Sequence, residues 1–362
     1  MNLLVFQIKV LKLKPKNNKE VSKIWDKGYN INKEVEKFTV DDDYILDQNL
    51  LFWDCVASIA HSKMLAKINL ISNNEYKKLK SILIEIINQD KQGLFKIKQE
   101  QEDCHTAIEQ YLIEILGDTG KKIHTARSRN DQVMVALKLY MKKELIEIEE
   151  LAKSFANVVL EFAKQNNVAM PGYTHMQKAM PSTVGLWATQ FVESMIDNIK
   201  QLQNIYGIID SNPLGSGAGY GSSFNIDREY TTKLLGFSKT QKNSIYVQLS
   251  RGKNESNILS SLMNIMLDIN KIATDLCLFT MSEFSYFKLP IEFTTGSSMM
   301  PQKKNPDVLE LIRAKSKVVE SLLFQVTGIY QNLMSGYNRD MQLTKKPLMD
   351  GIEITKTTLN IM

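Results

Sequence analysis

The sequence predicts an all-α protein built around a bundle of long helices, and three observations support this fold class. Among 362 residues there are only 17 glycines and 8 prolines, about 7% together against roughly 12% in average proteins, so helix-interrupting residues are scarce. Hydrophobic residues make up 43% and charged residues 23%, which is typical of a globular chain. Four long stretches repeat apolar side chains at spacings of three and four, the helical period.

The first part of the chain is expected to hold shorter helices. Residues 1–20 mix apolar residues and lysines around Pro15 and are expected to form an N-terminal extension. Apolar periodicity then predicts helices from Asp43 to about Leu70 and from Asn73 to Asn88. We expect these helices to belong to an N-terminal helical domain at 21–125.

The four long stretches are expected to form a central bundle domain at 126–362. The longest runs from Asn130 to Met170 and would span roughly 55 Å. Ser128 and Asp131 give an S-x-x-D cap at its start, and Pro171-Gly172 follows its end. The other three stretches are Ser182–Ile209, Glu255–Phe287 and Pro306 to about Leu333. The stretch Glu255–Phe287 is apolar on more than one face, which favours burial against other subunits, so we expect an oligomer.

Composition excludes several classes of function. The net charge is only +5, and lysines alternate with acidic residues, so we expect no nucleic-acid partner. No apolar run approaches the roughly 20 residues that span a bilayer, which predicts neither a membrane segment nor a signal peptide. Three distant cysteines fit a reducing cytoplasm, and neither CxxC nor HExxH spacing suggests a bound metal.

Arginine is rare in this chain. Of 45 basic residues only six are arginines, at positions 127, 129, 228, 251, 313 and 339. Because arginine offers a rigid, permanently charged fork that lysine lacks, these positions are candidates for sites that need such a bidentate group. Arg127 and Arg129 stand out because they share one short segment.

Four polar segments lie between the apolar helices, and we expect the chemistry to lie there. They are TARSRNDQ from Thr125, PGYTHMQ from Pro171, PLGSGAGYG from Pro213 and GSSMMPQKKNPD from Gly296. The last combines serines with Lys303 and Asn305, which is typical of an anion-binding loop with a candidate base. No G-x-S-x-G elbow supports a hydrolase. His175 in the second segment is a candidate proton-transfer group.

The glycine-rich segment from Gly215 to Gly221 does not fit a dinucleotide-binding loop. No G-x-G-x-x-G register is present, because the third glycine falls on Tyr220, Ser222 or Phe224. We interpret the segment as a conformationally special loop that supports the site. A further polar segment, Tyr337 to Lys346, is a candidate for recognising a polar ligand.

These four segments, in this order, resemble the argininosuccinate lyases of the aspartase/fumarase superfamily. GSSMMPQKKNPD resembles the superfamily signature, whereas TARSRNDQV and PGYTHMQ point to the argininosuccinate branch. The resemblance covers about residues 24–350 and implies a long-helix bundle whose central helices form a tetrameric core. It also implies active sites shared between the subunits of a homotetramer, and a cytoplasmic enzyme of arginine biosynthesis without metal or cofactor.

The implied reaction is the reversible cleavage of argininosuccinate to L-arginine and fumarate through an aci-carboxylate. By the match of motifs, Ser297 and His175 are the acid–base pair and Glu310 orients His175. Lys303 and Asn305 would hold the carboxylate on which charge builds up. The implied substrate-binding residues are Ser128, Arg129, Asn130 and Thr174, together with Tyr337, Gln342 and Lys345 around the arginine portion.

The chain departs from the family pattern in four places. Trp25–Tyr29 replaces the family's WGGRF segment, so a substrate-contacting serine beyond it has no counterpart. Leu343-Thr344 replaces an acidic pair, and Cys104 replaces an aliphatic residue. The sequence stops at Met362, where the family continues into a further helical region, so we expect the C-terminal helical domain to be truncated.

Two alternatives stay open at this point. Another lyase of the superfamily would act on adenylosuccinate, aspartate or malate. A catalytically silent helical oligomer would keep the fold without the reaction, although Ser297, His175, Lys303 and Asn305 are all present.

Overall fold

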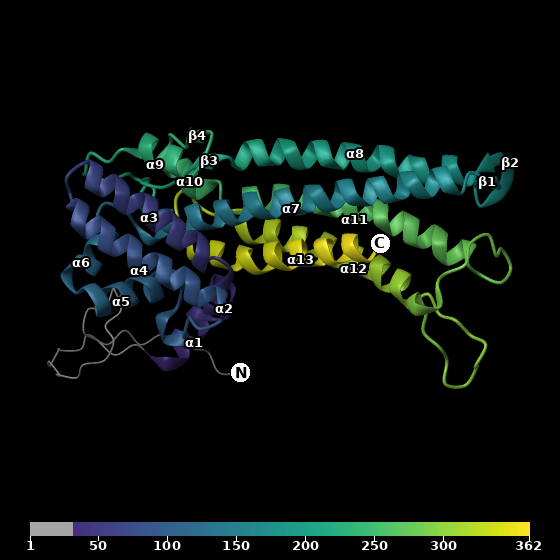
Figure 1. Cartoon of the computed structure of the whole chain (residues 1–362), viewed down its shortest axis with the longest axis horizontal. Helices are drawn as coiled ribbons and strands as arrows, with labels where there is room; N and C mark the ends of the chain where they lie inside the picture. The colour runs from purple at the N-terminus through teal and green to yellow at the C-terminus, as the bar shows by residue number, and fades with distance from the viewer. Residues whose placement is uncertain (1–31) are drawn as a thin grey trace.

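The computed structural model describes residues 32–362, and long helices lying side by side dominate it (Figure 1). The predicted extension at 1–20 and the Trp25–Tyr29 segment lie outside these residues. The long helices are α7 (Arg129–Gln165), α8 (Val184–Ile209), α11 (Lys253–Phe279), α12 (Asp307–Tyr330) and α13 (Lys345–Ile361). The predicted all-α helical bundle is confirmed.

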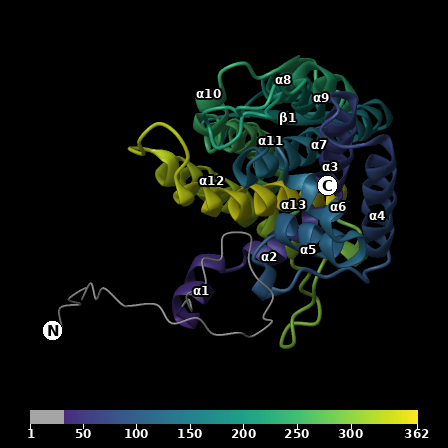
Figure 2. The ribbon, with the colours of Figure 1, turned by 90° about the vertical axis from the view of Figure 1, so that its left-hand side faces the viewer.

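Shorter elements surround one end of the bundle. Those before α7 are α1 (Lys33–Val40), α2 (Asp43–Leu46), α3 (Leu51–Lys67), α4 (Asn73–Lys91), α5 (Cys104–Leu116) and α6 (Asp118–Lys121), with 3₁₀ turns η1 (Asp47–Asn49), η2 (Gln99–Gln101) and η3 (Lys122–His124). Seen from that end, α4, α5 and α6 flank α7 and α13 on the side away from α8 (Figure 2). Helix α3 joins the two parts, because it packs against both α4 and α7.

The elements between the long helices are short. They are α9 (Arg228–Leu234), α10 (Ser244–Leu249), η4 (Ile291–Phe293) and η5 (Arg339–Thr344). Strands β1 (Ala169–Thr174) and β2 (Gln177–Thr183) form an antiparallel hairpin, and β3 (Ser211–Asn212) pairs in parallel with β4 (Lys239–Thr240). The hairpin closes the far end of the bundle (Figure 1).

Helix α7 begins as its sequence predicts. The Ser128 hydroxyl accepts a hydrogen bond from the Asn130 N–H, and the Asp131 carboxylate accepts one from the Ser128 N–H at 2.9 Å. These contacts satisfy N–H groups that a helix start leaves without partners. The helix ends at Gln165, earlier than predicted, because the backbone from Ala169 onward pairs in the hairpin instead.

Helix α11 lies at the centre of the core, packed against α8, α12 and α13. Its buried apolar residues include Ile258, Leu259, Leu262, Ile265, Met266, Ile269 and Ile272. The chain therefore buries most of this apolar stretch on its own, so the stretch by itself does not require other subunits, and the oligomer stays a prediction. Large apolar side chains are exposed instead on α8 and α12, including Leu186, Ile196, Leu311, Val318 and Phe324.

Two predicted boundaries and one missed helix correct the sequence analysis. The helix expected from Asp43 to Leu70 is interrupted at η1. Helix α11 ends at Phe279 rather than Phe287, because the chain turns back and packs Phe287 against Phe279 and Trp187, with ring centroids 5.9 and 5.2 Å apart. Helix α13 was not predicted.

In residues 32–362, no helix combines the length and apolar character needed to cross a bilayer.

Candidate active site

The signature loop runs from Thr295 to Asn305 at the far end of the bundle. Its two ends pair as an antiparallel bridge, with backbone N···O distances of 3.1 and 2.8 Å between Thr295 and Asn305. Within the loop, the Ser297 Oγ accepts hydrogen bonds from the N–H groups of Met299 and Met300 at 3.3 and 3.2 Å. Because both donors favour negative charge on this oxygen, the geometry suits a serine that gives up its proton.

His175 lies at the tip of the β1–β2 hairpin, where the sequence predicted only a polar segment between helices. Thr174 pairs with Gln177, so His175 and Met176 alone form the turn. Both have left-handed backbone angles, with φ of 52° and 59°. Such angles are costly for residues other than glycine and often mark functional positions. The exposed His175 side chain makes no hydrogen bond or ion pair with any residue from 32 to 362.

A cavity of about 350 Å³ opens at the opposite end, where α7 begins. Five of the predicted substrate-binding residues line it: Arg129, Asn130, Tyr337, Gln342 and Lys345. They come from segments about two hundred positions apart in the chain, and its volume lies within the range of about 300–1,000 Å³ usual for small-molecule sites. Ser128 does not line the cavity; its hydroxyl caps α7.

The glycine-rich segment is hydrogen-bonded to the start of α7, where the cavity opens. The buried Asp131 carboxylate accepts hydrogen bonds from the N–H groups of Gly215 and Gly217 at 2.8 and 2.9 Å, in addition to that of Ser128. One side chain thus ties the glycine-rich segment to the start of α7. A Cβ at Gly217 would lie 2.5 Å from the Gly221 carbonyl oxygen, so this close approach needs glycine.

Several cations around the cavity are already bound within the chain. The Lys345 ammonium is 1% exposed and lies 2.5 Å from Asp43 Oδ1 and 2.6 Å from Asp47 Oδ1. Burial opposes its charge, but Asp47 and Asp43 outweigh burial and raise the pKa of Lys345. Arg129 Nη1 lies 3.3 Å from Asp103 Oδ2, and Nη2 donates to Thr106 Oγ1. Both side chains therefore have structural partners that the sequence motifs did not indicate.

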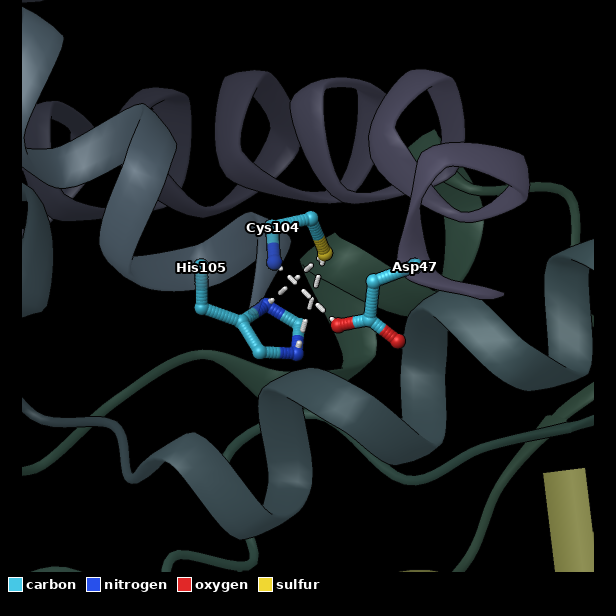
Figure 3. Close-up of side chains that lie close together, drawn as sticks. All are labelled: Asp47, Cys104 and His105. Atoms are coloured by element: carbon cyan, nitrogen blue, oxygen red, sulfur yellow. Dashed lines mark hydrogen bonds between the residues drawn. The ribbon is translucent and has the colours of Figure 1, made fainter. Parts of the chain in front are cut away.

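Asp47, Cys104 and His105 lie close together (Figure 3), and Asp47 is paired with Lys345, which lines the cavity. Their ligand-type atoms are within 4.8 Å of one another, which raises the question of a metal. The chemistry of the donors disfavours one. Asp47 is already paired with Lys345. Burial raises the pKa of the Cys104 thiol, which favours the protonated form that does not bind metals. Burial opposes a charge on His105, but Asp54, which forms an ion pair with it at 3.1 Å, outweighs burial and raises the pKa of His105. We interpret the cluster as a buried structural group that holds Lys345 in place beside the cavity.

The predicted site residues fall into two groups at opposite ends of the bundle. Arg129 and Asn130 lie at the start of α7, whereas Thr174 and His175 follow its end, and 37 helical residues separate them by roughly 55 Å. Ser297, Lys303 and Asn305 lie in the signature loop, also at the far end (Figure 1). Glu310, exposed in the first turn of α12, makes no hydrogen bond with His175 in the chain. One chain alone does not assemble the predicted site.

The structure adds cavity residues that the motifs did not select. Asp43, Glu102, Asp103, Arg251 and Arg339 line the same cavity. The Arg339 guanidinium and the Gln342 amide both donate to the Thr39 carbonyl oxygen, at 2.9 and 3.0 Å, which joins the end of α1 to the cavity wall. The rarity of arginine is the sequence signal that included positions 251 and 339 among six candidates.

His61 supports the segment that leads into α7 and gives a test of this packing. Its Nε2–H donates to the Thr125 carbonyl oxygen at 2.8 Å, and the side chain is fully buried. Burial, reinforced by the positive charge of Arg127, lowers the pKa of His61 from 6.5 to about 3. As pH falls from 6.5 towards 3, His61 becomes protonated in the unfolded chain but stays neutral in the folded chain. The free energy of unfolding therefore decreases over this pH range.

We expect His61→Gln to remove this pH dependence. The variant should be less stable than wild type at pH 8, and the difference in free energy of unfolding should shrink by about 2 kcal/mol by pH 5. Urea unfolding at both pH values measures the change. If the difference in free energy of unfolding between wild type and variant stays constant with pH, protonation of His61 does not destabilise the folded chain.

Comparison with known proteins agrees with the helical-bundle fold. Residues 18–320 match the family described as Lyase. The argininosuccinate lyase of Thermotoga neapolitana is 48% identical over 344 residues, covering 94% of this chain and 86% of that protein. The argininosuccinate lyase of Phocaeicola vulgatus is 44% identical over 340 residues, covering 94% and 76%.

A solved structure shares the fold at much lower identity. The native fumarate lyase:delta crystallin of Brucella melitensis superposes with a TM-score of 0.77 at 18% identity, over 90% of this chain and 78% of that one. The family match and the two relatives lead to one conclusion: the chain belongs to the argininosuccinate lyase family, within the aspartase/fumarase superfamily.

Proposed function

We propose that the protein is a carbon–nitrogen lyase that cleaves argininosuccinate reversibly to L-arginine and fumarate in the cytoplasm. Two relatives named argininosuccinate lyase match 94% of the chain at 48% and 44% identity, which supports this reaction over other lyases of the superfamily. The observation that carries the proposal is the cavity at the start of α7. It gathers Arg129, Asn130, Tyr337, Gln342 and Lys345, the residues that the motif match assigns to substrate binding.

In the proposed mechanism, Ser297 and His175 share the proton transfers. One takes the proton from the carbon beside a succinyl carboxylate, and the electron pair moves into that carboxylate to give the aci-carboxylate. The pair then forms the fumarate double bond as the carbon–nitrogen bond breaks, and the other group protonates the departing guanidinium nitrogen. The N–H groups of Met299 and Met300 support the anionic form of Ser297.

Lys303 and Asn305 would stabilise the charge that builds up on the carboxylate. Both lie in the signature loop with Ser297, and the bridge between Thr295 and Asn305 keeps the loop ends together. Fixed donors of this kind typically lower a barrier by several kcal/mol. Glu310 would orient His175 from another subunit, because the two side chains make no hydrogen bond within the described part of one chain.

The proposed working form is a homotetramer with shared sites. The two groups of site residues lie at opposite ends of α7, so a complete site needs the start of α7 from one subunit beside the far end of another. Exposed apolar side chains on α8 and α12, such as Leu186 at 67% and Phe324 at 66%, suit such contacts. We retain the division into 21–125 and 126–362, since short helices precede α7 and long helices follow it.

The direct test is a substrate panel on the purified full chain. We expect fumarate release, followed by ultraviolet absorbance, with argininosuccinate and not with adenylosuccinate, aspartate or malate. Release only from another succinyl compound would support a different lyase of the superfamily, and no release from any of them would support a silent oligomer. A chelator should leave the rate unchanged, because no step of the proposed mechanism uses a metal.

A further inference from the structure

We propose that Arg251 binds the α-carboxylate of the arginine portion of the substrate, a role that the family motifs do not give it. This inference rests on the proposed function and concerns the cavity at the start of α7. Arg251 follows α10 and its side chain lines that cavity although the residue is only 3% exposed. A buried guanidinium beside a cavity needs a partner, because leaving its charge and donors unpaired is costly.

Arg251 is the cation of this cavity that lacks a hydrogen-bond partner in the described chain. Lys345 is bound by Asp43 and Asp47, Arg129 by Asp103 and Thr106, and Arg339 by the Thr39 carbonyl. In contrast, no residue from 32 to 362 accepts a hydrogen bond from the Arg251 side chain, and its Nε is buried without a partner.

Two acidic groups that interact electrostatically with Arg251, Glu255 and Asp43, have other hydrogen-bond or ion-pair partners. The buried Glu255 carboxylate accepts hydrogen bonds from the Gly252 N–H at 2.7 Å and from Thr344 Oγ1 at 3.2 Å. Asp43 is bound to Lys345 at 2.5 Å. Neither forms an ion pair with Arg251 within the described chain. Glu255 and Asp43 therefore interact with Arg251 only electrostatically, without a hydrogen bond. The side-chain N–H groups of Arg251 remain available to a ligand.

The backbone holds Arg251 rigidly in this place. Its N–H donates to the Gln248 carbonyl oxygen at 3.2 Å, and the next residue, Gly252, has a φ of 77°. A Cβ at Gly252 would lie 2.7 Å from the Tyr330 ring, so the chain is tightly packed where α11 begins. Because Arg251 is also only 3% exposed, its side chain loses little freedom when it binds a ligand.

The chemistry of the substrate identifies the group that Arg251 binds. The residues assigned to the succinyl carboxylate, Lys303 and Asn305, belong to the far end of the bundle, whereas this cavity holds the residues assigned to the arginine portion. The carboxylate that this portion brings is the α-carboxylate. A guanidinium fork binds a carboxylate through two parallel hydrogen bonds, which a lysine ammonium does not reproduce.

Binding of L-arginine and agmatine by the full-length wild type, Arg251→Gln and Arg251→Lys tests the inference. Agmatine is arginine without its carboxylate, so the ratio of the two dissociation constants, measured by calorimetry, reports the carboxylate contact alone. We expect wild type to prefer arginine by at least about tenfold, since a hydrogen-bonded ion pair contributes about that much or more. Arg251→Gln should lose this preference while binding agmatine as wild type does, and Arg251→Lys should lie between them.

Three controls separate the possible outcomes. Lys121→Gln removes an exposed positive charge on α6 and should keep the preference. Equal weakening of both ligands in Arg251→Gln, or an unchanged preference, would overturn the inference. If thermal unfolding shows that Arg251→Gln does not fold, the ratio of the agmatine and arginine dissociation constants of Arg251→Lys tests the inference instead. A ratio equal to that of wild type would then overturn it.

Fumarate release by the wild type separates this inference from the proposed function. Wild type that cleaves argininosuccinate but binds arginine and agmatine equally would overturn only the role of Arg251. Wild type that releases no fumarate would overturn the proposed function, whatever the binding ratio. With an active enzyme, Arg251→Gln should raise KM for argininosuccinate at least about tenfold and change kcat less, as expected for a binding contact remote from the reacting carbon.

Discussion

Ser297→Ala is expected to lower turnover of argininosuccinate by at least about 10²–10⁴-fold, the usual contribution of a positioned acid or base. The reason is chemical, because alanine cannot exchange a proton, whereas the two backbone N–H groups that now face the Ser297 oxygen stay in place. The fold should be unaffected, since the side chain lies in a loop outside the helical core. Initial rates of fumarate release, with native mass on the same sample, measure both effects.

Ser298 supplies the matched control for this substitution. It is the adjacent serine in the same loop and its side chain is exposed. Ser298→Ala should therefore keep most of the wild-type rate. Full activity in Ser297→Ala, or equal loss in both variants, would remove Ser297 from the proposed mechanism.

Mixing two inactive variants is expected to restore activity when their defects lie at opposite ends of the bundle. Ser297→Ala disables the far end, and Asn130→Leu disables the cavity at the start of α7. If each site combines these ends from different subunits, random mixing gives each site about one chance in four of receiving both intact parts. Co-refolded equal mixtures should therefore show about one quarter of the wild-type rate of fumarate release.

A second mixture controls for effects of refolding itself. Ser297→Ala and Lys303→Met both alter the signature loop, so every loop in their mixture carries one defect. This pair should restore nothing. Equal recovery in the two mixtures, or none in the first, would contradict the sharing of sites between subunits.

The long helices are predictable because their signals are local. Repeating apolar spacing gives α7, α8, α11 and α12, and the Ser128 cap fixes the start of α7. The ends are harder to predict, since they depend on contacts between distant residues. Helix α7 ends early because the residues after it pair in the β1–β2 hairpin. Helix α11 ends early because Phe287 packs on Trp187, although apolar residues continue beyond Phe279.

The residues of the site were predictable by type, but not their pairing. Motifs selected Arg129, Asn130, Tyr337, Gln342 and Lys345, which line one cavity. Nothing local to Lys345 reveals that Asp43 and Asp47, about three hundred positions away, bind it. The unpartnered state of Arg251 likewise depends on what the folded chain places around it. Such electrostatic roles depend on tertiary contacts that periodicity does not encode.

The most direct test of the central claim is fumarate release measured across the fractions of a size-exclusion column with native mass detection. Because one chain keeps Asn130 and His175 at opposite ends of α7, cleavage of argininosuccinate should occur only in fractions that contain the assembled oligomer. Activity should therefore follow the tetramer mass and fall to background in monomer fractions. A monomer that cleaves argininosuccinate as fast per chain as the oligomer would contradict the shared site.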